Sequence, residues 1–437
     1  MKSRIYGIAA AGLATVFALS LTACGQSSSG GSAATTSDLT GNLNILVSSA
    51  PGSDTGFKAI NDIFSQLYPN VKVQFTTDPN DQYNAAKSSQ MTAGQADIVI
   101  ASPKQLPSYV PASNEGDDSR LADAGGFVDL TDQPFMSHFT SSVLDQIKYN
   151  GKVYAVPTGI TYYSGIMYNK QIFADNNLQV PTTWDEFVTL MGNMKTAGIQ
   201  PLGIGGKDSA GLNMLGLVQS LYPTSADKTN LAQGLYAYTT KLNEGTQLEV
   251  MTKLKTLYDN AEPNFAGVSY AQMTSDFVNG KFAMMSDGTW NTATIAQAGG
   301  DGFQFGYFPL PASNNAADNA NLGGKVELQL AIPSNAPDKA NALAWLDTFS
   351  QPENYGVFLS TAGFAPSEPG VPAGTFYDDI AQYTTTFQPA WDTIWFPNQQ
   401  AGQAAQWPFS WDAEAPMGTL DPQAAADAAE SAWEAGK

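Results

Sequence analysis

Leu43-Asn44-Ile45-Leu46-Val47 begins the stretch of sequence that decides the fold, because this short apolar run is typical of a buried strand. Apolar residues at helical spacing follow over 57–67, and residues 71–75 alternate between apolar and polar as in a half-buried strand. A second helical pattern over 83–91 leads to another apolar run over 97–101. This order of strand, helix, strand, helix and strand predicts a parallel sheet covered by helices, with any ligand at the carboxyl ends of the strands.

The same alternation begins again further along the chain. An apolar run over 162–168 predicts a strand, and Thr183 with Glu186 three residues later predicts a capped helix start. A repeat of fixed period is absent from the sequence, which argues against a solenoid. We therefore predict an α/β protein with two units. Further strands are expected over 201–204, 282–285 and 328–333, and further helices over 248–258, 273–278 and 337–349.

The beginning of the chain has the pattern of a secretory signal. Lys2 and Arg4 give a positive start, and the apolar run that follows ends at Cys24, the single cysteine. The end of this run resembles the lipobox of bacterial lipoproteins, which implies cleavage just before the cysteine and a diacylglycerol on its sulfur. We therefore expect a signal peptide over 1–23, and a lipidated cysteine with a flexible Gly/Ser-rich tether over 24–39.

The composition narrows the possible partners. The 437 residues carry a net charge of −20, which argues against nucleic acid and against electrostatic docking to anionic membranes. With one histidine, His138, and one cysteine, neither a histidine-based catalytic triad nor a histidine-rich zinc site is expected. Arg120 is the only arginine beyond the signal sequence. Because arginine is the usual partner of carboxylates and phosphates, we expect a neutral ligand. We also expect no metal and no cofactor.

Several stretches, in one order along the chain, resemble a known family. They cover residues 149–158, 166–170, 181–187, 277–290 and 331–334. Together with the lipobox-like sequence, they are similar to the extracellular solute-binding proteins (family 1) of carbohydrate ABC importers, in the maltose-binding-protein-like branch. Each stretch alone is a weak signal. Five of them in one order, over essentially the whole mature chain, are a strong one.

The resemblance implies a periplasmic-binding-protein-like fold, in which two α/β lobes joined by crossover hinge segments close on a sugar. It implies lobe one over 40–155 plus 312–350, and lobe two over 156–311 plus 351–437. It also implies a monomer, lipid-anchored to the outer face of the cell membrane, that delivers a neutral oligosaccharide to the transmembrane subunits of an ABC permease. On this interpretation the protein is not an enzyme.

The tryptophans are the first candidates for a sugar site, because aromatic rings stack on the apolar face of a sugar while polar side chains bind its hydroxyls. Trp290 follows the predicted strand over 282–285. The resemblance implies that Trp290 stacks on sugar, with Asp287 and Asn291 as hydrogen-bonding neighbours, although these two could instead cap a turn. Core packing is expected for the helical tryptophans Trp184, Trp345 and Trp433.

A second group of aromatic residues lies late in the chain. Trp391 and Trp395 are four residues apart, which would place them on one face of a helix. That face is either a stacking platform or a stripe of core residues, and the spacing does not decide between the two. The resemblance favours Trp395, because the family often has an aromatic platform in this late helical region. Trp411 and Asp412 are further candidates.

Polar and tyrosine candidates follow other predicted strands. Tyr162 and Tyr163 are neighbours near the first crossover, and one of them should point inward. The acidic residue that the maltose-binding branch carries just after this crossover is not evident at 160–163, so maltose specificity is not transferred. The candidates in lobe one are Ser49, Asp54 and Lys104, and those in a Gly-rich loop of lobe two are Asp208 and Asn213.

Three other functions stay open. A surface-anchored glycoside hydrolase would also use aromatic residues and a pair of carboxylates, but the two-unit alternation does not suggest an eight-fold barrel. A binding protein of the same fold could carry a non-sugar cargo, and the strong negative charge would suit a cation. A structural protein that binds peptidoglycan or another surface would show neither a hinge nor a saturable small ligand.

Overall fold

The computed structural model describes residues 39–405, 408–409 and 417–437. The predicted signal peptide, Cys24 and most of the tether lie outside these residues, as do Trp411 and Asp412. In the part of the chain that is described, no helix is both long and apolar enough to cross a membrane. The fold is therefore described for Leu39–Lys437 by itself.

The first sheet has five strands in the order β2-β1-β3-β11-β4. Strands β1, β2 and β3 are parallel, as the sequence predicts, and β11 runs antiparallel to both β3 and β4. The carboxyl ends of the three parallel strands thus lie at one edge of the sheet. The bounds are β1 (Gly41–Ser48), β2 (Val71–Asp78), β3 (Ile98–Ile100), β4 (Ala155–Val156) and β11 (Leu330–Ala331).

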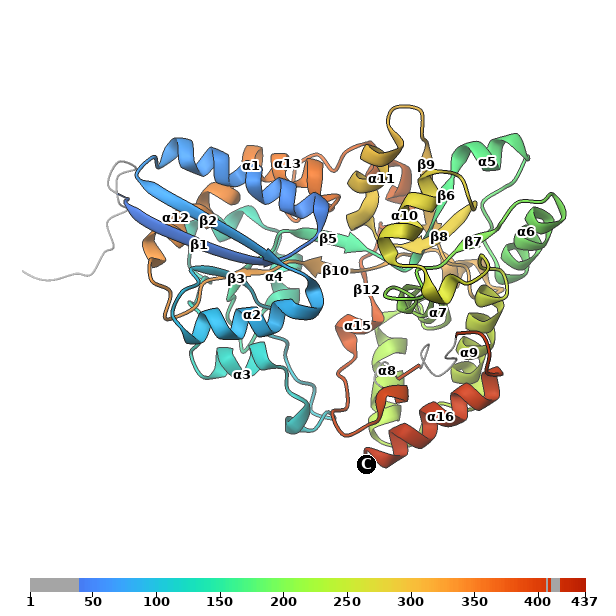
Figure 1. The fold of residues 1–437 in the computed structure, drawn as a ribbon. Helices are drawn as coiled ribbons and strands as arrows, with labels where there is room; N and C mark the ends of the chain where they lie inside the picture. The colour runs from blue at the N-terminus through green and yellow to red at the C-terminus, as the bar shows by residue number, and fades with distance from the viewer. Residues whose placement is uncertain (1–38, 406–407, 410–416) are drawn as a thin grey trace, which may run out of the picture. The chain divides into compact units, whose positions relative to one another are not determined.

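Helices α1 (Pro51–Leu67), α12 (Lys339–Phe349) and α13 (Pro352–Ala362) enclose the main core of this sheet. Figure 1 shows α1 and α13 side by side, and their residues are in close contact. This core therefore continues past Ser350, where the sequence analysis ended lobe one; the predicted lobe boundaries stay a prediction. The other helices on this part of the chain are α2 (Asn80–Thr92), α3 (Asp117–Asp123) and α4 (Ser141–Ile147).

The second large sheet has four strands in the order β7-β8-β6-β9. Strand β6 is antiparallel to both β8 and β9, and β7 is parallel to β8. The expected start of α6 is confirmed: the Thr183 side chain accepts a hydrogen bond from the Glu186 backbone, and the Glu186 side chain bonds back to Thr183. The strands are β6 (Gly165–Asn169), β7 (Leu202–Gly203), β8 (Met284–Asp287) and β9 (Phe305–Pro309).

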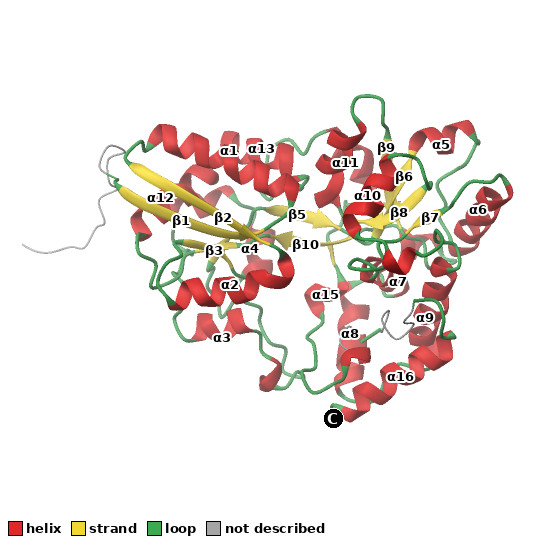
Figure 2. Ribbon diagram, viewed as in Figure 1, coloured by secondary structure: helices red, strands yellow, loops and turns green. Residues whose placement is uncertain are grey.

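The helices around this second sheet form two core clusters with it, and Figure 2 shows most of these helices as a group apart from those of the first sheet. They are α5 (Lys170–Asp175), α6 (Trp184–Thr196), α7 (Gly211–Leu221), α8 (Ser225–Tyr236), α9 (Gly245–Tyr258), α10 (Tyr270–Val278), α11 (Thr292–Gly299), α14 (Thr375–Ile380), α15 (Trp391–Ile394) and α16 (Pro422–Ala435).

A small third sheet lies where the chain passes between the two large ones. Its order is β12-β10-β5, with β5 (Gly159–Tyr162), β10 (Gly323–Glu327) and β12 (Gln388–Pro389). The prediction of one strand over 162–168 is therefore wrong. The chain leaves β10 after Tyr163, whose N–H donates to Gly323, and pairs with β9 from Gly165 onward. The apolar run continues through this change of partner, so the sequence pattern does not reveal it.

Candidate ligand-binding site

Trp290 lies just beyond the carboxyl end of β8, in the short 3₁₀ turn Thr289–Asn291. Its indole N–H donates to the Tyr270 hydroxyl at 2.8 Å, and that hydroxyl donates to Asp287 Oδ1 at 2.7 Å. The second carboxylate oxygen, Oδ2, accepts from the Asn291 amide at 2.6 Å. Because Asp287 is fully buried, these bonds anchor the indole ring to the protein interior.

The buried carboxyl group of Asp287 has an unusual ionisation. Burial raises its pKa to about 6, although hydrogen bonds from Asn291, Tyr270 and the Gly288 backbone act in the opposite direction. Asp287 and Asn291 were predicted to bind ligand hydroxyls. The structure places both behind Trp290, where the carboxylate accepts from protein donors and the amide donates to protein acceptors. Their geometry is that of groups that position the ring.

Gly288 allows the indole to sit against the backbone. A Cβ atom at this position would lie 2.3 Å from atoms of the Trp290 ring, which is far inside van der Waals contact. Any other residue would push the ring away from its present position. The spacing Asp287-Gly288-Thr289-Trp290 therefore combines an anchor, a close approach and an aromatic side chain in four residues.

A cavity of about 510 Å³ opens in front of Trp290. The rings of Tyr163, Tyr270 and Trp290 line it, and the centroids of Tyr163 and Trp290 are 5.4 Å apart. Its wall also includes the Gly-rich loop before α7 and the first turns of that helix. The charged side chains on the wall are Lys207, Asp208, Lys325 and Asp392. Aromatic faces next to a few charged hydrogen-bonding groups suit a ring that has apolar faces and a polar rim.

The charged groups on the far side of the cavity form one network. The Tyr163 hydroxyl donates to Asp392 Oδ1 at 2.5 Å. The Lys325 ammonium lies 3.3 Å from Glu327 and 5.4 Å from the centroid of the Tyr163 ring. Burial alone would lower the pKa of Lys325, but the negative charges of Glu327 and Asp392 outweigh it, so the pKa is raised. Lys325 is therefore a cation at neutral pH, facing two carboxylates.

Two more cavities adjoin this one. A cavity of about 480 Å³ shares Lys325 and Asp392 with the first and reaches the carboxyl-end edge of the first sheet at Ser48 and Ser102. A third, of about 750 Å³, lies between α2, α3 and the segment 395–399 and also includes Asp392. Asp392 thus lines all three, between the two large sheets, at the strand ends where the sequence analysis expected a ligand.

The predicted site residues divide between the cavities and the interior. Tyr163, Asp208 and Trp290 line the first cavity, and Lys104 lines the second and third. Both neighbouring tyrosines are buried, but Tyr163 borders the first cavity whereas Tyr162 packs against Phe387 in a core.

Ser49, Asp54 and Asn213 are absent from the walls of these three cavities. Ser49 Oγ donates to Asp54 Oδ2 at 2.7 Å, and Asp54 Oδ1 accepts from the Ala50 backbone at 3.1 Å, so the pair closes the first turn of α1. Asn213 is buried, and its carbonyl oxygen accepts from Ser286 at 2.7 Å. Ligand contacts by Ser49, Asp54 and Asn213 stay predictions. In this structure the three side chains are hydrogen-bonded to other groups of the protein.

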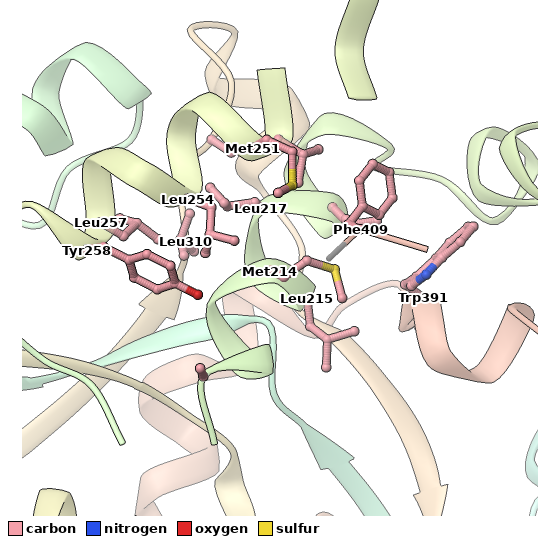
Figure 3. Packing of buried hydrophobic residues seen from close by; sticks show 14 of the residues in the cluster. Met214, Leu215, Leu217, Met251, Leu254, Leu257, Tyr258, Leu310, Trp391 and Phe409 are labelled. Atoms are coloured by element: carbon pink, nitrogen blue, oxygen red, sulfur yellow. The ribbon is translucent and has the colours of Figure 1, made fainter. Parts of the chain in front are cut away.

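Trp391 and Trp395 belong to the core around the second sheet. Their rings stack with centroids 5.2 Å apart at an angle of 18°, and only 1% and 2% of their surfaces are exposed. Figure 3 shows Trp391 beside Phe409, Met214 and Leu215. This favours the core-stripe alternative, although Trp395 also borders the third cavity. The expected core positions of Trp184, Trp345 and Trp433 are confirmed.

The residues of the first cavity wall that the sequence analysis did not name include Tyr270, Lys325 and Asp392. Asp392 could have been found, because it is the one acidic residue inside the aromatic stretch 391–396. Tyr270 begins α10, 20 residues before Trp290, and Lys325 follows two glycines in a short strand. Nothing in the local pattern of either one indicates a site.

Comparison with known proteins adds an independent line of evidence. The family described as "Bacterial extracellular solute-binding protein" matches residues 50–356. The chain is 28% identical over 285 residues to the multiple sugar-binding protein of Streptococcus mutans, which is 64% of each chain. It is 25% identical over 233 residues to a probable sugar-binding periplasmic protein of Brucella suis, 52% of this chain and 53% of that one. The chain thus spans less than two thirds of the length of these relatives.

Solved structures agree over most of the length. The chain is similar to RafE in complex with raffinose, with a TM-score of 0.73 and 21% identity, covering 90% of this chain and 98% of that one. It is similar to a chitin oligosaccharide binding protein, with a TM-score of 0.72, 21% identity and the same coverage. A sugar transporter of Bacillus licheniformis in complex with stachyose gives 0.69 and 17%, covering 89% and 98%. These likenesses confirm the predicted two-lobe α/β fold.

Proposed function

The chain belongs to the bacterial extracellular solute-binding protein family, and we propose that it is the substrate-binding component of an ABC importer. It captures a neutral oligosaccharide between its two lobes and delivers it to the transmembrane subunits of the permease. The lobes close because the sugar contacts both, which stabilises the closed state. The relatives with sugar-binding names and the sugar-bound neighbours support this substrate class.

The observation that carries the proposal is the anchored indole of Trp290 on the wall of the first cavity. A ring fixed through Tyr270 and a buried carboxylate offers a flat apolar face without having to be ordered on binding. Tyr163, which is buried, supports this wall from behind, and Asp208, Lys325 and Asp392 can bond hydroxyls at the sugar's rim. Lys325 and Lys207 face an equal number of acidic groups there, which suits an uncharged ligand.

The remaining parts of the proposal concern where the protein works. Cys24, next to a secretory pattern, would carry the lipid that holds the chain on the outer face of the cell membrane, and the tether over 24–39 would let the folded part reach the permease. We propose a monomer that binds sugar without cleaving it. The two carboxylates at the first cavity already accept hydrogen bonds, Asp208 from the Tyr270 backbone and Asp392 from Tyr163.

A ligand screen tests this function. Protein expressed from residue 37 would be mixed with neutral oligosaccharides of α- and β-linkage, charged sugars, amino acids and polyamines, and its Tm measured before calorimetry. A true ligand at one hundred times its Kd adds about 2.7 kcal/mol to the stability. A shift with intact sugar recovered supports a transport receptor, whereas cleaved sugar would make the protein a hydrolase. A response to a cation alone would overturn the carbohydrate assignment.

A further inference from the structure

Lys104 follows β3 of the first sheet, yet its ammonium group contacts the segment 392–396 of the other core. Its Nζ donates to the backbone oxygen of Trp395 at 2.9 Å and to that of Asp392 at 3.3 Å. It also lies 4.1 Å from the centroid of the Phe396 ring. Carbonyl groups at the end of a helix have no hydrogen-bond donor within the helix, and a lysine side chain can donate to them instead. Here the lysine comes from almost 300 residues away in the sequence.

We propose that Lys104 is a positioning residue for sugar binding. From the first lobe, its side chain bonds the end of α15, a contact that we call the clasp, and thereby fixes the position of Asp392 on the cavity walls. This inference rests on the proposed function. It revises the sequence-based expectation that Lys104 contacts the ligand. The donors of its ammonium group are directed to two carbonyl oxygens and an aromatic face, and Lys104 is not on the wall of the cavity in front of Trp290.

The short length of α15 makes such a support necessary. The helix has four residues, Trp391–Ile394, so its own hydrogen bonds cannot hold it firmly. Trp391 and Trp395 fix one side in the core. Asp392, between them in sequence, is partly exposed and accepts from the Tyr163 hydroxyl. Tyr163 holds the carboxylate itself, and Lys104 holds the backbone of the same short turn, so the position of the carboxylate depends on both contacts.

A second contact on the same loop provides a natural comparison. Asn114 accepts a hydrogen bond from the Gln399 backbone at 3.2 Å and donates to the Tyr236 hydroxyl at 3.3 Å. That hydroxyl donates to the backbone oxygen of Phe396 at 2.7 Å. Asn114 thus holds the same segment beyond Phe396, through hydrogen bonds to Gln399 and Tyr236 and not to Asp392. Removing it should loosen the segment without disturbing the carboxylate.

The ionisation of Lys104 reflects the burial of its ammonium group. Burial lowers its pKa to about 8, against the attraction of Asp392. The other charged groups on the walls that it shares are Lys87, Asp117, Asp118 and Arg120 beside α2 and α3, and Lys325 and Glu327 on β10. A lysine in water titrates near 10.4. The lowered pKa of Lys104 is therefore that of an ammonium group already enclosed in the clasp without sugar.

The test compares Lys104→Met with Lys148→Met, which removes an exposed lysine just after α4 that is paired with Asp145. Asn114→Ala is the third variant, and Lys104→Gln, which keeps a donor, is the fourth. Two measurements are made: amide hydrogen exchange over 391–399 without sugar, and calorimetry with the first of raffinose, stachyose or a chitin oligosaccharide that raises the Tm.

Lys104→Met should speed exchange over 391–395 and weaken binding about tenfold, mostly through faster dissociation. Lys148→Met should stay within twofold of the parent in both readouts. Lys104→Gln should fall between the parent and Lys104→Met. Asn114→Ala should speed exchange over 396–399 and change the affinity less than threefold.

Weaker binding by Lys104→Met with unchanged exchange over 391–395 would overturn the positioning role and make Lys104 a direct sugar contact. If Lys104→Met leaves both the exchange over 391–395 and the affinity unchanged, Lys104 has no positioning role and the proposal is wrong. If the parent binds none of these sugars, the proposed function fails for them, while the exchange comparison still decides whether Lys104 holds the segment.

Discussion

Trp290 is the side chain whose removal should cost the most binding energy. It is one of three rings on the wall of the first cavity, and its N–H is already bonded to Tyr270, so its free face is available to a ligand. Trp290→Ala should weaken sugar binding by about 2 kcal/mol, roughly 30-fold in Kd, because buried aromatic anchors dominate binding sites. Calorimetry checks the value.

The control for this variant is Tyr238→Ala. Tyr238 is a partly buried aromatic residue that contacts Trp433 and Lys437 and is not on the wall of the first cavity. It should leave the Kd within twofold of the parent. Equal losses in both variants would mean that Trp290 acts through general stability, and the sugar platform would have to be sought elsewhere among the cavity rings.

Gly288 tests whether the position of the ring matters as well as its presence. The Cβ of Gly288→Ala would meet the indole at 2.3 Å, so the ring has to move. Overpacking of this kind costs about 1 to 3 kcal/mol, and here it would displace a binding surface. We expect weaker sugar binding and a changed tryptophan emission, measured by titration fluorescence. Gly267→Ala, where a Cβ would have open space, should change neither.

Helix α6 shows how much a local signal can contribute to stability. Its capping box at Thr183 and Glu186 orients a helix whose inner face buries Phe187, Met191 and Met194. Thr183→Ala should lower the unfolding free energy by about 1 kcal/mol, which in a chain of this size is a Tm shift of about 1 to 2 °C. Differential scanning calorimetry measures it.

Thr196→Ala is the matched change at the other end of α6. Thr196 is exposed, and its hydroxyl bonds only to the Gly192 carbonyl within the same helix. It should leave the Tm within about 0.5 °C of the parent, since surface changes away from caps are small. A larger shift at Thr196 than at Thr183 would contradict the assigned role of the cap.

The elements that could be predicted are those whose signals are local. The capping box marked α6, and apolar runs marked β1 and β3, because burial of a strand or a helix face leaves its period in the sequence. The break between β5 and β6 at Tyr163 was missed, since both strands are buried and only their partners differ. Register and pairing are properties of the tertiary structure.

The same reasoning explains the mixed result at the site. Tyr163 follows β5 and Trp290 lies in the turn after β8, and the ends of strands can be located from the sequence pattern. Tyr270 and Lys325 reach the cavity only because α10 and β10 pack there. Asp287 has a side chain of the kind that binds sugar hydroxyls. Its complete burial depends on the elements packed around it, so it could not be deduced from its neighbours in the sequence.

At the level of the whole chain, two distant segments meet beside the small third sheet. Ile160 of β5 and Ala365 exchange backbone hydrogen bonds at 2.8 Å. Gly159 makes this approach possible, because a Cβ there would lie 2.7 Å from Phe364. Three residues beyond Ala365, Glu368 is buried, and neither of its carboxyl oxygens has a hydrogen-bond partner among the residues that the structure describes.

Glu368 should make the stability depend on pH. Burial raises its pKa to about 7 from an ordinary value of 4.5. Between these values the folded chain binds the proton more tightly than the unfolded chain, so this group's contribution to stability falls as the pH rises. Glu368→Gln removes the charge. After allowance for solvent screening, it should raise the unfolding free energy at pH 8 by about 2 kcal/mol and leave it nearly unchanged at pH 4.

Urea unfolding of parent and variant at pH 4, 6 and 8 measures this difference, and the exposed Glu353→Gln on α13 controls for the loss of one negative charge. Other buried acids such as Asp287 titrate in both proteins and cancel in the comparison. If the unfolding free energy of Glu368→Gln exceeds that of the parent only above pH 5, the buried charge of Glu368 destabilises the place where the segments of Ile160 and Ala365 meet. A loss of stability at pH 8 would instead mean that the carboxylate is bonded in solution, and that the segment around Ala365 is held by it.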